Sequence, residues 1–392
     1  MKSLFIHDFR VKHDKVTDIY YSTGFSYQIW NRYLTVFDSL KIISRYERIN
    51  PQNEDRPLIS SGSNVTFSPI QSFGSLTSLI KNFRTIYKQL IKDISDSEAV
   101  IIRLPSVLGI MSALICIKLK KKYYIEVVGA MFESYWYYGT FMSKLLAIPA
   151  DLLQKKAVKQ ASVVTYITES YLQNKYKTKG IRFDSVSNII LDNEFEDSLR
   201  KEEVSNSKKV KIGLVGSTFV KYKGHDTAIK ALSLLKRQGY DICLEFVGEG
   251  LSDYIDQLIE KYNLSENIRF IGMINDREKL NRWYRSLDIY IQPSKTEGHG
   301  RAVVEAISNG VPVLASNKGG LPDSVHRDFL FDSRNESALA FAVKKLINNE
   351  GLREININEN IAKIKKYKKR VVQQKRIEAL DSYRSLILEE EK

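Results

Sequence analysis

Short runs rich in Val, Ile, Phe and Tyr alternate with longer amphipathic runs along most of this 392-residue chain. A short apolar run between turn residues is typical of a buried β-strand, whereas a longer run with apolar residues three or four positions apart is typical of an α-helix. Strands that alternate with helices favour parallel sheets connected by crossover helices. The sequence therefore predicts an α/β fold.

The alternation falls into two parts, separated by a polar, charged stretch at residues 192–209 that is typical of a linker. Before this stretch, strands are predicted at residues 4–9, 40–44, 99–103, 123–128 and 162–166, and helices at 25–37, 76–91, 107–118 and 141–160. After it, strands are predicted at residues 210–215, 242–247, 268–271, 289–292 and 311–315, and helices at 225–237, 253–262, 277–286 and 301–309.

A chain of this length most often forms two domains. We expect two Rossmann-like, doubly wound domains that face each other across a cleft, because open parallel sheets bind ligands at the carboxyl ends of their strands. The expected boundaries are an N-terminal domain at residues 1–191, the linker at 192–209, a C-terminal domain at 210–350 and basic helices at 351–392.

The formal net charge of +14 is unusual for a chain of ordinary composition. Positive charge is dense in the run Lys120, Lys121 and Lys122, and in residues 363–376, which hold eight basic and no acidic side chains. Such patches attract nucleic acids, anionic lipid headgroups or phosphorylated ligands. A soluble surface with a basic bias explains them equally well.

Cys116 and Cys243 each lie inside an apolar stretch, which favours two buried thiols in a reducing compartment. The N-terminus reaches His7 and Asp8 too early for the apolar region of a signal peptide. The longest apolar run, residues 107–117, is shorter than the roughly 20 residues that span a bilayer. We therefore expect a cytoplasmic protein without a membrane span.

Residues 287–325 carry the most specific pattern. A strand ends at Pro293, a loop with Glu297, Gly298 and Gly300 follows, and a helix begins near residue 301. Glycines before a helix let the backbone approach a ligand closely, and the positive end of the helix suits a phosphate group. Glu305 lies about one turn into that helix, within reach of a ribose beside the phosphate. Taken alone, Glu305 is more typical of an exposed helix residue.

This arrangement resembles glycosyltransferase family 4, whose members have the GT-B fold and transfer sugars from nucleotide-sugar donors with retention of configuration. The resemblance rests on Glu297 and Glu305 with seven residues between them, on residues 310–312 (GVP) and on Gly319-Gly320. It continues upstream to Gly216, Lys223-Gly224 and residues 247–250 and 270–272, and more weakly to residues 161–168 and 187–188.

The resemblance implies a role for each matched residue. Glu297 is expected to contact the donor sugar, Glu305 the ribose and Lys223 the diphosphate, with Glu297 and Lys223 as the catalytic residues. Cleavage of a sugar–diphosphate bond leaves negative charge on the leaving group, which a cation and a helix N-terminus stabilise. The expected donor site comprises Gly216, Ser217, Lys221, Lys223, Gly272, Glu297, His299, Gly300, Arg301, Glu305, Gly319 and Gly320.

The sequence departs from the family at several points. Ser217 stands where many members have an arginine, and Lys221 is the candidate to supply that charge. Gly24 stands where the N-terminal glycine loop of the family faces the diphosphate. No histidine follows the strand at residues 125–129, and His7 and His13 are expected to be structural or surface residues. The resemblance implies that neither a metal ion nor another cofactor is needed.

The N-terminal domain is expected to bind a saccharide acceptor. Its basic run at residues 118–122 and its aromatic run at 132–138 suit an anionic membrane surface that presents a lipid-linked acceptor, such as an undecaprenyl-diphosphate oligosaccharide. A buried apolar helix and a core aromatic cluster are an equal alternative.

The resulting prediction is a retaining glycosyltransferase of the hexosyltransferase class in bacterial capsule, exopolysaccharide or O-antigen synthesis, located at the inner face of the cell membrane. One alternative is a nucleotide-sugar epimerase of GT-B shape. The other is a basic nucleic-acid-binding protein, although the chain contains no recognisable nucleic-acid module. We expect no nucleic-acid partner, and the sequence leaves the oligomeric state open.

Overall fold

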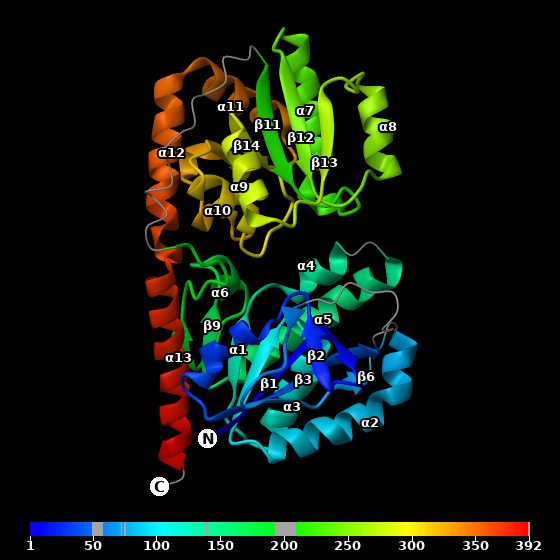
Figure 1. The fold of residues 1–392 in the computed structure, drawn as a ribbon, viewed down its shortest axis with the longest axis vertical. Coiled ribbons are helices and arrows are strands. Elements are labelled where there is room, and N and C mark those ends of the chain that lie inside the picture. Colours follow the sequence, from blue (N-terminus) through cyan, green and yellow to red (C-terminus); the bar gives the residue numbers. More distant parts are fainter. Residues whose placement is uncertain (49–57, 72, 74–75, 138–139, 193–208, 391–392) are drawn as a thin grey trace.

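The computed structural model describes residues 1–48, 58–71, 73, 76–137, 140–192 and 209–390 (Figure 1). Within these residues the N-terminal half forms one mixed sheet. Its strands are β1 (Lys2–Asp14), β2 (Ile19–Ser22), β3 (Ser39–Arg48), β4 (Leu58–Ile59), β5 (Val65–Phe67), β6 (Ile70–Gln71), β7 (Ala99–Leu104), β8 (Tyr124–Val127), β9 (Val163–Tyr166) and β10 (Ile181–Phe183). Strands β10, β9, β8, β7, β1 and β3 are parallel neighbours in that order, and β3 also pairs with β5 and β6.

Helices cover both faces of this sheet. They are α1 (Tyr27–Leu34), α2 (Leu76–Ser95), α3 (Val107–Lys118), α4 (Met131–Trp136), α5 (Phe141–Gln160) and α6 (Tyr171–Lys175), together with α13 (Lys369–Glu390) from the far end of the chain. Alternate residues of β1 point to opposite faces. Leu4 and Ile6 pack in the core beneath α2, α3 and α5, whereas Phe5 packs with α1 and α13.

The C-terminal half contains a second, fully parallel sheet. Its strands are β11 (Val210–Val215), β12 (Ile242–Val247), β13 (Ile268–Gly272), β14 (Ile289–Gln292), β15 (Val313–Ser316) and β16 (Leu330–Phe331), and their order is β13-β12-β11-β14-β15-β16. In chain order this is 3-2-1-4-5-6, the arrangement of a Rossmann fold. The strand order reverses between β11 and β14, which creates a crevice at their carboxyl ends.

The helices of this half pack in two groups. Helix α7 (His225–Arg237) contacts α8 (Asp253–Lys261) and α11 (Glu336–Asn348), and α10 (Arg301–Ser308) contacts α9 (Arg277–Arg285) and α12 (Glu350–Ile364). Side chains cap several of them at the N-terminus, as Asp276 does by accepting a hydrogen bond from the Lys279 amide at 2.8 Å.

Two connections join the halves, and they contact each other. The Leu191 amide donates to the Tyr367 carbonyl at 2.9 Å, and the Lys369 amide donates to the Leu191 carbonyl at 2.8 Å. Close by, Arg376 Nη2 donates to the Ser187 carbonyl at 2.7 Å. Helix α13 then runs along the N-terminal half (Figure 1), where Tyr383 is fully buried.

The predicted α/β fold with two Rossmann-like domains is confirmed. The described part of the predicted basic segment, residues 351–390, is helical, but α13 belongs to the core of the N-terminal half. Residues 193–208 of the predicted linker lie outside the described residues, and the boundaries at 192 and 209 stay predictions. Leu191 already packs in the C-terminal core. None of the described helices is both long and apolar enough to cross a membrane.

Candidate active site

Lys223 and Glu297 meet at the crevice of the C-terminal sheet. Lys223 ends a short 3-10 helix, η2 (Lys221–Lys223), that follows β11, and Glu297 lies in the loop that follows β14. The Nζ atom of Lys223 lies 2.6 Å from Oε1 of Glu297. Both side chains are largely buried, with exposed fractions of 22% and 11%. The two predicted catalytic residues therefore form one charged pair at the topological switch point.

A chain of polar groups along β14 orients Glu297. Ser294 Oγ donates to Glu297 Oε1 at 3.0 Å, and Gln292 Nε2 donates to Ser294 Oγ at 2.8 Å. Tyr290 OH in turn donates to Gln292 Oε1 at 2.5 Å. Tyr290 and Gln292 are buried in β14 and Ser294 is buried two residues beyond it, so these partners hold the carboxylate against a rigid element.

The environment keeps Lys223 charged. Burial lowers the pKa of Lys223, but the charge of Glu297, the Tyr222 phenol and the hydrogen bond to Glu297 outweigh it, so the net pKa lies above the ordinary value. The site therefore holds a permanent cation at neutral pH.

Two glycines let the loops approach one another at this pair. Gly224 has a φ of +79°, and a Cβ atom there would lie 2.1 Å from the Pro293 carbonyl oxygen. Gly319 has a φ of +59°, and its Cβ would lie 2.0 Å from the Glu297 carbonyl oxygen. The Gly320 amide donates to that same oxygen at 3.0 Å. The Gly319-Gly320 turn thus packs directly on the Glu297 loop.

Glu305 lies on α10, on the side of α9. Tyr284 OH donates to Glu305 Oε2 at 3.1 Å. Burial raises the pKa of Glu305, while the hydrogen bond from Tyr284 and the charges of Arg301 and Arg277 oppose the rise. A partly buried carboxylate, which accepts hydrogen bonds from hydroxyl groups, fits the predicted ribose contact.

The start of α10 brings together three further predicted residues. Gly300 is the N-cap residue with a φ of +76°, and the exposed Arg301 opens the helix. His299 is buried, and its Nδ1 atom lies 3.5 Å from Ser187 Oγ. Burial, with the charges of Lys366 and Arg301, lowers the pKa of His299 to about 3. His299 is therefore neutral and faces the N-terminal half.

Four residues predicted to bind the donor make no hydrogen bond or ion pair with Lys223 or Glu297 in the described part of the chain. Lys221 is exposed, and its Nζ atom lies 4.8 Å from the centre of the Tyr254 ring. Gly272 ends β13, two strands away from β11. Ser217 lies beside Gly216 after β11 with a buried Oγ that has no hydrogen-bond partner within the described residues. Gly24 is exposed ahead of α1 and does not line the cavity described next.

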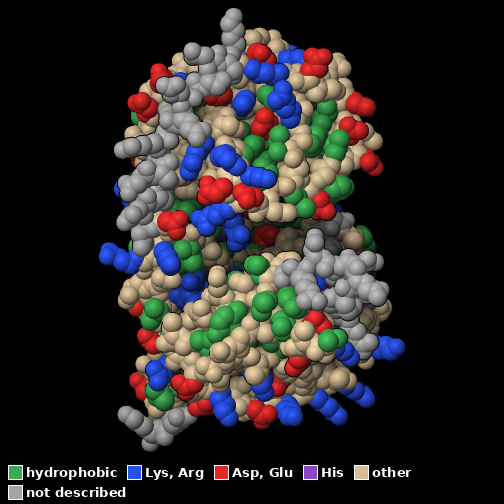
Figure 2. All heavy atoms as spheres, viewed as in Figure 1, with side chains coloured by type: hydrophobic (Ala, Val, Ile, Leu, Met, Phe, Trp, Pro, Cys, Tyr) green, Lys and Arg blue, Asp and Glu red, His purple; other side chains and the backbone are tan. Residues whose placement is uncertain are grey.

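A cavity of about 340 Å³ lies between the two halves, where the space-filling view is hollowed (Figure 2). Its size is typical of small-ligand pockets. The C-terminal half contributes Tyr222, Thr296, Glu297 and Gly298, and the N-terminal half contributes His7, Pro105, Val128, Gly129, Ala130, Glu133, Ser134 and Tyr171.

His7, which the sequence favours as a structural or surface residue, lines the cavity. Its Nδ1 atom accepts a hydrogen bond from the Phe9 amide at 3.1 Å. Burial, with the charges of Arg103 and Arg45, lowers the pKa of His7 to about 3. The ring is therefore neutral. Its place in a central strand of the first sheet is the signal that could have identified it.

Glu133 is a second cavity residue that the sequence did not indicate. Lys175 Nζ lies 2.5 Å and 2.7 Å from its two carboxylate oxygens, and Tyr171 OH donates to Oε1 at 2.7 Å. Glu133 belongs to the aromatic run, part of which folds as α4. The sequence leaves that run open between a membrane surface and a core aromatic cluster, and neither interpretation predicts its contribution to a cleft wall.

The two basic runs make many internal contacts. In the first run, Lys121 Nζ donates to the Ile94 carbonyl at 2.7 Å, and Lys122 Nζ donates to the Leu386 carbonyl at 2.6 Å. In the second, Lys363 Nζ donates to the Pro322 carbonyl at 2.6 Å, and Lys366 Nζ lies 2.6 Å from Glu169 Oε1. Much of this charge thus serves to hold segments together.

No group of three or more His, Cys, Asp or Glu side chains within the described residues is arranged to hold a metal ion. That the reaction needs no metal stays a prediction. Both cysteines are free thiols and buried, as the sequence indicated.

Solved structures share this architecture. Anabaena HepE, determined in complex with UDP and glucose, has a TM-score of 0.66 and 15% identity, over 97% of this chain and 100% of HepE. An α,α-trehalose 6-phosphate synthase from Burkholderia multivorans has a TM-score of 0.70 and 11% identity, over 100% of this chain and 99% of that protein. Two facing Rossmann-like domains with the charged pair between them place the protein in the GT-B fold class.

Comparison with related sequences identifies the family, which the shared fold alone does not. Residues 195–367 match the family described as "Glycosyl transferases group 1". Protein CapJ of Staphylococcus aureus is 46% identical over 387 residues, which is 99% of this chain and 97% of CapJ. The capsular polysaccharide biosynthesis glycosyltransferase CapM of the same species is 29% identical over 184 residues, which is 45% of this chain and 46% of CapM. The chain belongs to the group 1 glycosyl transferases and is a glycosyltransferase.

Proposed function

We propose that this enzyme is a retaining member of glycosyltransferase family 4 that acts in capsular polysaccharide synthesis. It transfers a sugar from a nucleotide-diphosphate donor to a saccharide carried on a lipid diphosphate at the membrane. The relatives CapJ and CapM support the capsule assignment. The observation that carries the proposal is the Lys223–Glu297 pair, because Glu297 lines the cavity between the halves and holds Lys223 behind it.

The charged groups of the C-terminal half indicate how the donor is bound. During transfer the bond between the anomeric carbon and the diphosphate oxygen breaks, and negative charge grows on that oxygen. Lys223 and the positive end of α10 stabilise this charge. Glu297 accepts hydrogen bonds from the sugar hydroxyls, and Glu305 accepts those of the ribose. When the donor enters, the diphosphate replaces Glu297 as the main partner of Lys223.

The acceptor side is the opposite wall of the cavity. There the acceptor hydroxyl forms the new bond to the anomeric carbon on the face that the diphosphate leaves, and its proton passes to the departing phosphate oxygen. His7 is neutral and therefore contributes a hydrogen bond rather than a charge. Glu133, held by Lys175 and Tyr171, is placed to orient an acceptor hydroxyl.

Two substitutions test the site. We expect Lys223→Met and Glu297→Gln each to lower kcat/KM by about 100-fold or more, because each removes a contact to the reacting groups. The measurement is sugar transfer from a nucleotide sugar identified by a thermal-shift screen. Thermal unfolding of each variant shows whether the fold is intact.

Lys295→Met is the matched control. Lys295 pairs with Asp226 at 3.0 Å and has a similar exposed fraction of 21%, but its partner Asp226 does not line the cavity, whereas Glu297 does. Its loss should leave transfer within a few-fold of the wild type. Near-normal turnover of both site variants would refute the assignment of Lys223 and Glu297.

Product analysis separates the proposal from its alternatives. Retention predicts that the new glycosidic bond keeps the anomeric configuration of the donor, which the proton coupling constant of the product reports. Conversion of the nucleotide sugar into its epimer without any acceptor would instead identify an epimerase.

A further inference from the structure

A surface helix usually turns its large apolar side chains toward the core. Helix α5 has the opposite orientation. Its buried residues are small or polar: Ala147, Asp151, Gln154, Ala157 and Val158. Asp151 Oδ1 accepts a hydrogen bond from Tyr176 OH at 2.5 Å, and Gln154 bonds to the backbone of Gly129 and Met131. Polar contacts fix this orientation of the helix.

The opposite face of α5 carries large apolar side chains in contact with solvent. Phe141, Leu145, Ile148 and Leu152 are spaced four, three and four residues apart and therefore form one stripe. Their exposed fractions are 76%, 57%, 60% and 58%. Met142, beside this stripe, is 56% exposed. Contiguous exposed apolar surface of this kind marks an interaction site.

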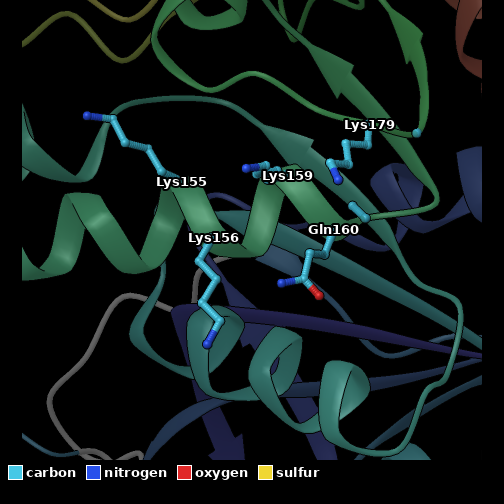
Figure 3. A pocket seen from close by; sticks show the side chains of 7 residues that line it. Lys155, Lys156, Lys159, Gln160 and Lys179 are labelled. Atoms are coloured by element: carbon cyan, nitrogen blue, oxygen red, sulfur yellow. The ribbon is translucent and has the colours of Figure 1, made fainter.

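Lysines continue the stripe toward the C-terminal end of the helix. The helix contains four lysines, and Asp151, its one acidic residue, is buried. Lys156 and Lys159 line a groove of about 780 Å³ with Lys179 from the neighbouring loop, and Figure 3 shows these side chains around the end of the helix. The exposed charge of α5 is therefore positive throughout.

The apolar stripe starts beside the cleft. Helix α4 packs against α5, and its residues Glu133 and Ser134 line the cavity between the domains. At the other end of α4, Trp136 is 41% exposed, and Lys144 Nζ of α5 lies 5.9 Å from the centre of its ring. An aromatic side chain beside lysines is typical of the membrane–water interface.

We propose that the outer face of α5, together with Trp136, docks the enzyme on an anionic lipid bilayer. The apolar stripe enters the headgroup region, and Lys156, Lys159 and Lys179 contact the phosphates of anionic lipids. This inference rests on the proposed function, because it places the mouth of the cleft where a lipid-linked acceptor leaves the bilayer. It keeps Trp136 of the predicted aromatic run at residues 132–138 and moves the basic contact from residues 118–122 to α5.

Vesicle flotation of the full chain tests the surface. The wild type should bind vesicles of phosphatidylglycerol and phosphatidylcholine, and bind vesicles of pure phosphatidylcholine at least 10-fold more weakly. The double variant Leu145→Glu/Leu152→Glu should bind the anionic vesicles at least 10-fold more weakly than the wild type, and Lys156→Glu/Lys159→Glu should also lose binding. Equal binding by the wild type and the Leu145→Glu/Leu152→Glu variant would overturn the proposal.

The control is Phe341→Glu/Ile355→Glu on α11 and α12. These side chains are exposed to a similar extent, at 59% and 54%, but lie on the C-terminal half. This variant should bind vesicles as the wild type does. Unchanged thermal unfolding shows that each variant folds.

Transfer to a short, water-soluble acceptor separates the two proposals. If docking fails but transfer to this acceptor persists, the surface assignment is wrong and the proposed function stands. If the chain binds anionic vesicles through α5 but transfers no sugar, the function is wrong and the surface stands. A concentration-dependent dimer that Leu145→Glu/Leu152→Glu converts to monomer would assign the face to a second copy and overturn the lipid proposal.

Discussion

At the scale of single residues, Glu305 shows a conflict between stability and binding. Burial raises its pKa, so the folded protein holds a proton on this group at a pH where the unfolded chain has released it. Stability attributable to Glu305 therefore falls as the pH rises from the ordinary carboxyl range through the raised pKa. At neutral pH the buried, charged carboxylate therefore destabilises the folded protein. We expect this residue to be kept because it binds the ribose.

We therefore expect Glu305→Gln to raise the midpoint of thermal unfolding at pH 7, by roughly 1–3 °C, and to weaken nucleotide binding by about 10-fold. The gain in stability should shrink as the pH is lowered toward 4, where the wild-type carboxyl is protonated. The measurements are thermal unfolding at both pH values and calorimetric titration with the nucleotide. Destabilisation by the same amount at both pH values would contradict this account.

The sequence could predict that Lys223 and Glu297 share a site, because both follow strands that end at one sheet edge. It did not lead us to His7 or Glu133. Their role depends on how the N-terminal half faces Glu297, and only the packing of two distant segments determines that.

At the scale of elements, the Gly319-Gly320 turn controls the position of the Glu297 loop. A Cβ atom at residue 319 would overlap the Glu297 carbonyl, so Gly319→Ala should displace the loop and lower kcat/KM by about 100-fold. Steady-state transfer kinetics measure this effect.

Gly239→Ala is the matched control for strain. Gly239 also has a positive φ, of +86°, but no atom lies within 4 Å of a Cβ placed there. Both substitutions should cost roughly 1–2 kcal/mol of stability through the backbone conformation, and the control should keep its transfer rate. Similar kinetics for the two variants would show that the turn does not position Glu297.

Elements with a strong local sequence pattern were predictable nearly to the residue, such as α3, α5, β11 and α7. The structure differs from the prediction where a strand is extended by pairing with another segment, and where strands are very short. Strand β1 extends to Asp14 because it pairs with β2, and β4 to β6 are two or three residues long. The path of α13 was not predictable, because its partners are distant in the chain; Val100, for example, precedes Tyr383 by 283 positions.

At the scale of the whole molecule, polar contacts hold the two halves in the observed arrangement. Lys366 Nζ lies 2.6 Å from Glu169 Oε1, and the Glu169 amide donates to Asp323 Oδ2 at 2.8 Å. An exposed ion pair contributes about 0–1 kcal/mol to the conformation that contains it. The loss of Lys366 should therefore increase the ratio of molecules with a wider cleft to molecules in the observed arrangement by up to about 5-fold.

We expect Lys366→Ala to increase the radius of gyration of the free enzyme in small-angle X-ray scattering, and nucleotide sugar to reverse part of the increase. Lys344→Ala, which removes a contact to Gln238 inside the C-terminal half, should leave the radius unchanged. An unchanged radius for Lys366→Ala would mean that other contacts set the arrangement.

The two connections between the halves meet at Leu191 and Lys369, where their backbones are hydrogen-bonded. A single covalent crossing would let one domain twist, slide or swing relative to the other. Two crossings fastened together at one point leave little freedom except rotation about that point. The junction is therefore the expected hinge between the halves. Because α13 packs on the N-terminal half and begins at this hinge, it moves with that half when the cleft opens. A probe near Leu388, which moves with the N-terminal half, would report the angle of the cleft when paired with a second probe on the C-terminal half.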